Sequence, residues 1–119
     1  MDFNGRIAFE AAQFAEAHPD AAVFYFDAHH LSLLIRRSPY RFPETASLVN
    51  MEGYCYFYAD RNYPKNHLGV TFIEECGVDI SQWYWRDDVH MTEPFHRLLA
   101  RLMVEMMADP GKRLPYEFY

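Results

Sequence analysis

The pattern of apolar and polar residues along the chain predicts three helices. Residues 4–17 place apolar side chains on one face and charged side chains on the other, and residues 28–37 and 93–108 have the same spacing. Asp27 and Thr92 stand immediately before the second and third of these segments, where N-capping residues are expected. We therefore expect amphipathic helices that bury one face each.

The remaining segments predict strands and a long loop. Residues 21–26 form a continuous apolar run, which is typical of a strand covered on both faces, and residues 82–85 predict a short last strand. Residues 38–77 show no sustained period and are expected to form a long loop insertion, while residues 112–119 form a tail. Helix, strand and helix in close succession indicate a single α/β domain over residues 1–119.

Composition and charge exclude several classes of partner. The chain has 119 residues, half of them apolar, which is enough for one core and too apolar for a disordered segment. Its formal charge of -6 disfavours nucleic acids and anionic membranes. No apolar run approaches the ~20 residues of a membrane span. The N-terminus lacks the basic and apolar regions of a signal peptide, and the localisation stays open.

The cysteines and histidines do not predict a metal site. Cys55 and Cys76 lack the close pairing of zinc ligands, and two readings remain for them. A disulfide would stabilise the fold by roughly 3 kcal/mol, whereas two buried free thiols suit an intracellular chain, which the missing signal peptide favours. His29 and His30 are adjacent on a predicted helix, so they point about 100° apart and seldom bind one ion. We expect no metal.

The segment before the last helix carries the candidate chemistry. Asp87 precedes His90 by three residues, so its carboxylate can bend back and hydrogen-bond the imidazole ring. Such a bond fixes the ring tautomer and stabilises the imidazolium, which prepares a histidine to act as a general base. Asp88 is the alternative acid. The plainer interpretation is a helix-capping acid beside a partly exposed histidine, a common surface arrangement.

The wider pattern resembles a known family. Asp87-x-x-His90, then Thr92, then a helix in which His96 is followed by Arg-Leu-Leu-Ala, resembles the last block of GDSL-type, or SGNH, ester hydrolases. Residues 4–37 are similar to the helix, strand and helix that precede it in lipase-like and acetylesterase-like members. The resemblance implies that Asp87 and His90 are the triad acid and base, in the C-terminal portion of a three-layer α/β/α, flavodoxin-like fold with few strands.

The resemblance carries two further implications. Relatives of this kind have paired cysteines in the corresponding loop, so a disulfide between Cys55 and Cys76 is implied. Full-length relatives are also expected to be secreted. One departure within the block is Met91, because many lipase-like members have proline after the histidine.

The nucleophile of that family has no counterpart in the chain. The family places it in a Gly-Asp-Ser turn and places its oxyanion donors in two middle blocks. No serine here stands in such a turn; the serines are Ser32, Ser38, Ser47 and Ser81. A missing nucleophile lowers turnover by about 10⁶. We expect a fragment of an ester hydrolase, weak or inactive alone, that needs no cofactor and whose substrate is a small or lipid-like ester.

Two other hypotheses stay open. The chain could be a non-catalytic remnant that serves as a binding or interaction module, or a small unrelated α/β protein with a coincidental Asp-x-x-His. The predicted strand at residues 21–26 would have few partners within the chain. A complementing chain or a homo-oligomer would then supply the missing sheet.

Overall fold

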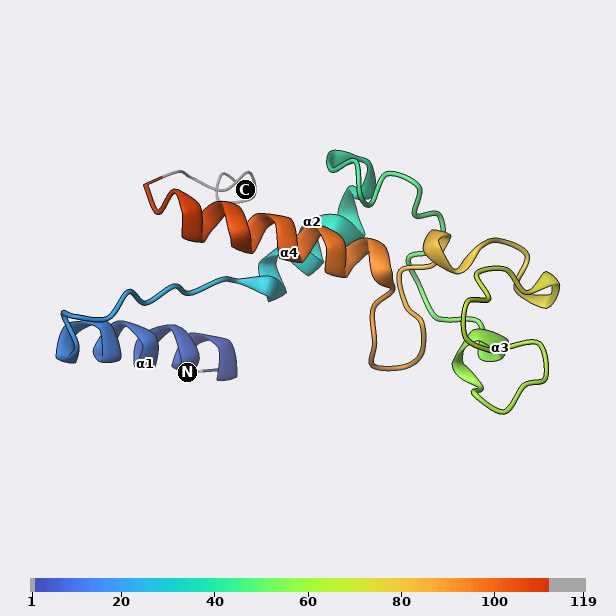
Figure 1. Cartoon of the computed structure of the whole chain (residues 1–119), viewed down its shortest axis with the longest axis horizontal. Coiled ribbons are helices and arrows are strands. Elements are labelled where there is room, and N and C mark those ends of the chain that lie inside the picture. Colours follow the sequence, from blue (N-terminus) through green and yellow to red (C-terminus); the bar gives the residue numbers. More distant parts are fainter. Residues whose placement is uncertain (1, 112–119) are drawn as a thin grey trace.

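The computed structural model describes residues 2–111, and the predicted tail at residues 112–119 lies outside them. Helix α2 (Ala28–Arg37) and helix α4 (Glu93–Ala108) cross in the middle of the molecule (Figure 1). Helix α1 (Phe3–Ala17) lies at one end, and the short helix α3 (Tyr56–Ala59) lies at the other. Three 3-10 turns complete the secondary structure: η1 (Pro39–Arg41), η2 (Glu74–Cys76) and η3 (Ile80–Gln82).

Local sequence signals set the bounds of the long helices. The Asp27 carboxylate accepts a hydrogen bond of 2.8 Å from the His30 backbone N–H, which satisfies a donor that the first turn of α2 leaves free. Helix α4 has Thr92 at its N-cap position and ends at Ala108, where Asp109 is the C-cap. The predicted ranges of α2 and α4 are confirmed, and α1 begins one residue before its predicted start.

The expected α/β fold is wrong for the described residues. Helices make up 49% of them, strand residues only 4%, and no sheet is formed. The strand residues come from two isolated bridges, one parallel between Asn50 and Trp83 and one antiparallel between Trp85 and Met91. A strand gains its ladder hydrogen bonds only by pairing, and the described chain offers the run at residues 21–26 no second strand. The expected strand at residues 82–85 is replaced by the end of η3 and these bridges.

The main core, a cluster of buried side chains, joins α2 to α4. Its members come from both helices and from the segments between them: Leu31, Leu34, Ile35, Phe42, Leu48, Tyr84, Phe95, Leu98 and Leu102. Beside this core, Arg101 of α4 forms an ion pair with Glu44, which lies in the segment after η1. The main core therefore fixes the start of α4 and the turn that precedes it.

A second cluster lies under the long loop. It has three buried members, Tyr58, Ile73 and Cys76, and a disulfide joins Cys55 to Cys76 across 21 positions of sequence. The Tyr58 hydroxyl donates to the Val78 carbonyl oxygen at 2.7 Å and accepts from the Ile73 backbone N–H at 3.1 Å. The predicted loop insertion thus contains η1, α3 and η2 and has a small core of its own.

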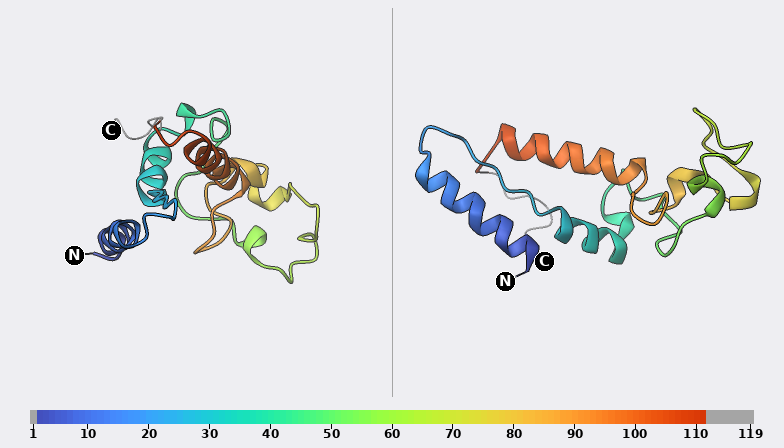
Figure 2. Two further views of the ribbon diagram at one scale, coloured as in Figure 1. Left: turned by 60° about the vertical axis from the view of Figure 1, so that its left-hand side comes forward. Right: turned by 90° about the horizontal axis from the view of Figure 1, so that it is seen from below.

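Helix α1 and the segment after it contribute no buried residue to either cluster, although Phe26, at the end of that segment, packs against the main core. None of the residues of α1 is buried, although its pattern is amphipathic as predicted. The chain then turns and returns along α1 as an extended segment that leads to α2 (Figure 2). This arrangement lengthens the molecule, whose radius of gyration of 17.3 Å exceeds the ~13.5 Å expected for a compact domain of this size. As the sequence predicts, no helix in residues 2–111 has the length and apolar character required to cross a membrane.

Candidate functional site

The candidate site is a tight turn at the N-terminal end of α4. The Arg86 backbone N–H donates to the His90 carbonyl oxygen at 2.8 Å, and the bridge between Trp85 and Met91 closes the turn at its base. Below it, the Thr92 backbone N–H donates to the Tyr84 carbonyl oxygen at 2.9 Å. Because Tyr84 belongs to the main core, the turn is held against the best-packed part of the molecule.

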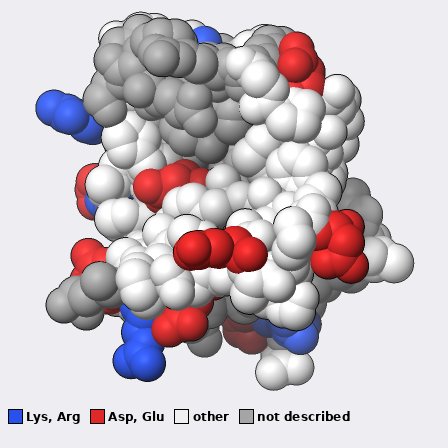
Figure 3. Space-filling view, turned by 90° about the vertical axis from the view of Figure 1, so that its left-hand side faces the viewer, with Lys and Arg blue, Asp and Glu red and all other residues white. Residues whose placement is uncertain are grey.

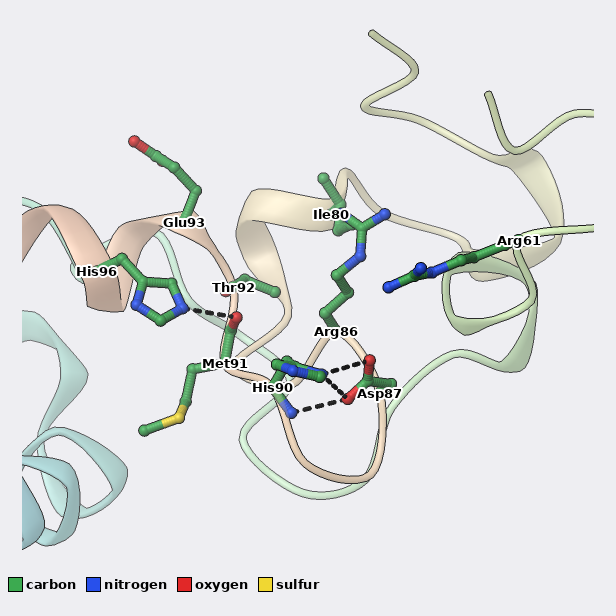
Figure 4. Close-up of a pocket in the computed structure, with 9 residues that line it drawn as sticks. All are labelled: Arg61, Ile80, Arg86, Asp87, His90, Met91, Thr92, Glu93 and His96. Carbon is green, nitrogen blue, oxygen red and sulfur yellow. Dashed lines mark hydrogen bonds and ion pairs between the residues drawn. The ribbon is translucent and has the colours of Figure 1, made fainter. Parts of the chain in front are cut away.

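Asp87 and His90 contact one another within this turn. The His90 Nδ1 atom lies 2.9 Å from Asp87 Oδ2 and 3.0 Å from Asp87 Oδ1 (Figure 4). The same carboxylate accepts from the backbone N–H groups of Val89 at 2.9 Å and His90 at 2.7 Å. An ionised carboxylate only accepts hydrogen bonds, so Nδ1 carries a proton and, in the neutral ring, Nε2 keeps its lone pair.

The surroundings of Asp87 favour its charged form. The pKa of Asp87 is lowered from its usual 3.8 to about 2, first because the Val89 backbone N–H donates to the carboxylate and then because His90 does. Asp88, the alternative acid, is exposed and makes no hydrogen bond to a described residue. Asp87 is therefore the carboxylate that orients His90.

We expect Asp87→Asn to reduce stability by about 1 kcal/mol at neutral pH and by almost nothing at pH 2. Between the usual pKa of 3.8 and the folded pKa of about 2, the unfolded chain binds more protons than the folded chain. The contribution of the ionised Asp87 carboxylate to the free energy of unfolding is therefore complete above about pH 4, and it is lost as the pH falls toward and through 2. Urea unfolding at pH 6, 4, 3 and 2 measures it. Asp88→Asn is the matched control, and an equal loss in both variants would contradict a specific role of Asp87.

A cavity of about 410 Å³ lies beside this pair. Its lining comes from the turn, the first turn of α4, η3 and the loop after α3: Arg61, Ile80, Arg86, Asp87, His90, Met91, Thr92, Glu93 and His96. The His90 side chain is 64% exposed and that of Asp87 is 24% exposed, so the ring is open to a ligand while the carboxylate is partly covered. His96 Nε2 lies 3.2 Å from the Met91 carbonyl oxygen, which accepts its hydrogen and keeps that ring beside the cavity.

No nucleophile reaches His90 from the described residues. None of the four serines lines the cavity, and the hydroxyls of Ser32 and Ser81 hydrogen-bond to Tyr84 and Asp79 at 2.6 and 2.7 Å. Thr92 lines the cavity, but the residue is buried and its hydroxyl donates to the Trp83 carbonyl oxygen. Both cysteines are in the disulfide. The cavity therefore contains an oriented base without a hydroxyl or thiol for it to activate.

Other residues that the sequence singled out lie away from this cavity. His29 and His30 are on α2, and residues 2–111 contain no group of three metal-binding side chains. The cysteines form the disulfide, and not the two free thiols that the sequence left as the alternative. It closes the loop that contributes Arg61 to the cavity lining.

Sequence reasoning missed two cationic residues of the site. Arg61 and Arg86 both line the cavity, and their side chains lie near one another although 25 positions separate them in the sequence (Figure 4). Neither was a candidate. Arg86 could have drawn attention as a neighbour of Asp87, but nothing in the sequence places Arg61 near it. Their proximity depends on how the loop folds.

No protein family, curated protein or solved structure gives a significant match to this chain.

Proposed function

We propose that His90 and Asp87 are the base and the acid of a serine-type ester hydrolase, and that another polypeptide segment supplies the nucleophile. The observation that carries the proposal is the hydrogen bond between His90 Nδ1 and the Asp87 carboxylate, with the ring on the wall of a cavity. Nε2 makes no hydrogen bond to a described residue, so it is available to take a proton.

The proposed chemistry uses these two residues in sequence. As a serine hydroxyl attacks the ester carbonyl, its proton passes to His90 Nε2, and Asp87 stabilises the imidazolium that forms. The leaving alcohol takes that proton when the ester bond breaks. Water then gives a proton to Nε2 as it attacks the acyl-enzyme. When the bond between the acyl carbon and the serine oxygen breaks, that proton returns to the serine oxygen, so the free acid leaves and the serine hydroxyl is restored. Acetyl, longer acyl and phospholipid esters all fit this scheme, which uses no cofactor.

A second candidate function is an interaction module without catalysis. Two observations favour it. No serine or cysteine of the described residues lines the cavity. Residues 22–25 are extended, their backbone groups make no hydrogen bond to a described residue, and the side chains of Val23, Phe24 and Tyr25 are exposed. An exposed apolar strand is a template for pairing with another chain. The same feature would serve the first proposal, since a complementing polypeptide could dock there and bring the serine.

Ester hydrolysis tests the proposal directly. We expect the chain purified alone to hydrolyse 4-nitrophenyl acetate weakly or not at all. We expect tagged chain isolated without denaturation from its source cells, with its bound polypeptide, to be active. His90→Ala should lower that activity by about 10²–10⁴, the usual contribution of a general base. A fluorophosphonate probe should label a serine in the bound polypeptide.

His29→Ala is the matched control, because His29 is an exposed histidine on α2 outside the cavity. Equal activity in both histidine variants, or no activity in either preparation, would refute the hydrolase and leave the interaction module. Strong activity of the chain alone that requires His90 would show that the nucleophile lies within this chain, which contradicts the proposed complementation.

A further inference from the structure

Arg61 and Arg86 have no partner of opposite charge among the described residues. Within residues 2–111 neither guanidinium makes an ion pair or a hydrogen bond, although the chain has an excess of acidic residues. The two carboxylates of the shared cavity are already engaged: Asp87 with His90, and Glu93 with Arg97 at 3.4 Å. Two guanidinium groups that face one hollow repel each other, and an anion between them would remove that repulsion.

A second cavity, of about 350 Å³, adjoins the first and shares both arginines. It is lined by Arg61, Asn66, His67, Leu68, Gly69, Val70 and Arg86, and none of these is an acid. The opposite end of the molecule differs: acidic side chains are spread over the surface around α1 and the end of α4 (Figure 3). The second cavity is thus lined by cationic and neutral residues although the chain as a whole has a formal charge of -6.

We propose that Arg61 and Arg86 form a binding site for the oxyanion group, carboxylate or phosphate, of a small molecule that extends toward His90. Guanidinium groups bind both oxyanions through paired N–H donors, and the cavity volume is at the lower end of the range for small-molecule sites. Anion binding itself requires no catalysis. If His90 also acts as proposed above, the substrate is an ester with an anionic group, and that part alone rests on the proposed function.

The test is a titration of the full chain, ¹⁵N-labelled, with sodium phosphate and separately with sodium succinate, at constant ionic strength set with sodium chloride. We expect saturable shifts of the Nε–Hε signals of Arg61 and Arg86 with at least one of the two anions. The anion that saturates these shifts at the lower concentration shows whether the site prefers phosphate or carboxylate. Arg61→Gln and Arg86→Gln should each weaken binding about tenfold or more, because each removes a charge-assisted pair of hydrogen bonds. Arg61→Lys should weaken it less.

Arg37→Gln is the matched control, since it removes the same charge from an exposed arginine on α2 outside both cavities. Shifts that fail to saturate with either anion, or an equal loss in Arg37→Gln, would overturn the site. Amide spectra identify any variant that does not fold. If Arg61→Gln does not fold, the binding affinity of Arg61→Lys for the anion is measured in its place. Because binding is read without a substrate, the two proposals can fail separately. Anion binding by the chain, combined with no His90-dependent activity in the preparation that keeps the bound polypeptide, would refute the hydrolase and keep this site.

Discussion

Tyr84→Ala is expected to lower the free energy of unfolding by about 3–5 kcal/mol, the usual cost of removing a large buried aromatic ring. Tyr84 is 0% exposed and lies in the centre of the main core. Its ring makes edge contacts with Trp85 and Phe95, at centroid distances of 5.0 and 6.0 Å. Its hydroxyl lies 2.6 Å from the Ser32 hydroxyl of α2. One side chain thus connects α2, α4 and the segment that leads into the candidate turn.

Tyr84→Phe separates packing from hydrogen bonding. It keeps the ring and removes only the bond with Ser32, so we expect a loss of about 1 kcal/mol. Urea unfolding followed by tryptophan fluorescence measures both variants, with Trp83 and Trp85 as neighbouring probes. Similar losses in the two variants, or a loss below about 1 kcal/mol in Tyr84→Ala, would contradict the central position of this ring in the core.

The helices were predictable because their signals are local. Asp27 marks the start of α2, and an apolar stripe of period 3.6 marks α4, so no knowledge of distant residues is needed. The apolar run at residues 21–26 carries a local signal too, but a strand is completed only by a neighbour. The described chain supplies none, so no strand forms at these residues. The strand prediction is wrong there, because an apolar run in a single sequence does not show whether a neighbouring strand exists.

In the candidate site too, the local contacts were predictable from the sequence and the long-range contacts were not. Asp87 and His90 are three residues apart, so their spacing alone makes the hydrogen bond accessible, and the structure has it. The roles of these residues in catalysis stay a prediction. Arg61 reaches the same cavity only through the path of the loop from α3 to η2, which involves the disulfide and the packing of Tyr58. Long-range contacts of that kind leave no period or motif in a single sequence.

The disulfide between Cys55 and Cys76 is expected to decide whether that loop is folded. The second cluster has only three buried members, and one of them is Cys76 itself. The bond closes a loop of 21 positions, for which the loss of chain entropy in the unfolded state corresponds to ~3 kcal/mol. So small a cluster has little other burial to offset the entropy of ordering the loop.

The double variant Cys55→Ala/Cys76→Ala should therefore unfold the loop locally while the main core persists. We expect the backbone amides of Tyr58 and Ile73 to exchange with solvent about 10²-fold faster, as ~3 kcal/mol implies, whereas those of Leu98 and Leu102 in α4 stay protected. Hydrogen exchange followed by NMR reads both regions in one sample. Unchanged exchange in the loop would mean that Tyr58 and Ile73 hold it without the bond, which would refute the expectation.

The same variant separates the two parts of the site. Arg61 lies inside the closed loop, whereas Asp87, His90 and Arg86 lie in the turn that Tyr84 holds against the main core. Loss of the loop should weaken anion binding about as strongly as Arg61→Gln does. The His90 ring should keep its Nδ1–H tautomer, which the ¹⁵N shifts of the imidazole report, because its bond to Asp87 is local to the turn. Loss of that tautomer along with anion binding would instead show that the loop and the turn fold as one unit.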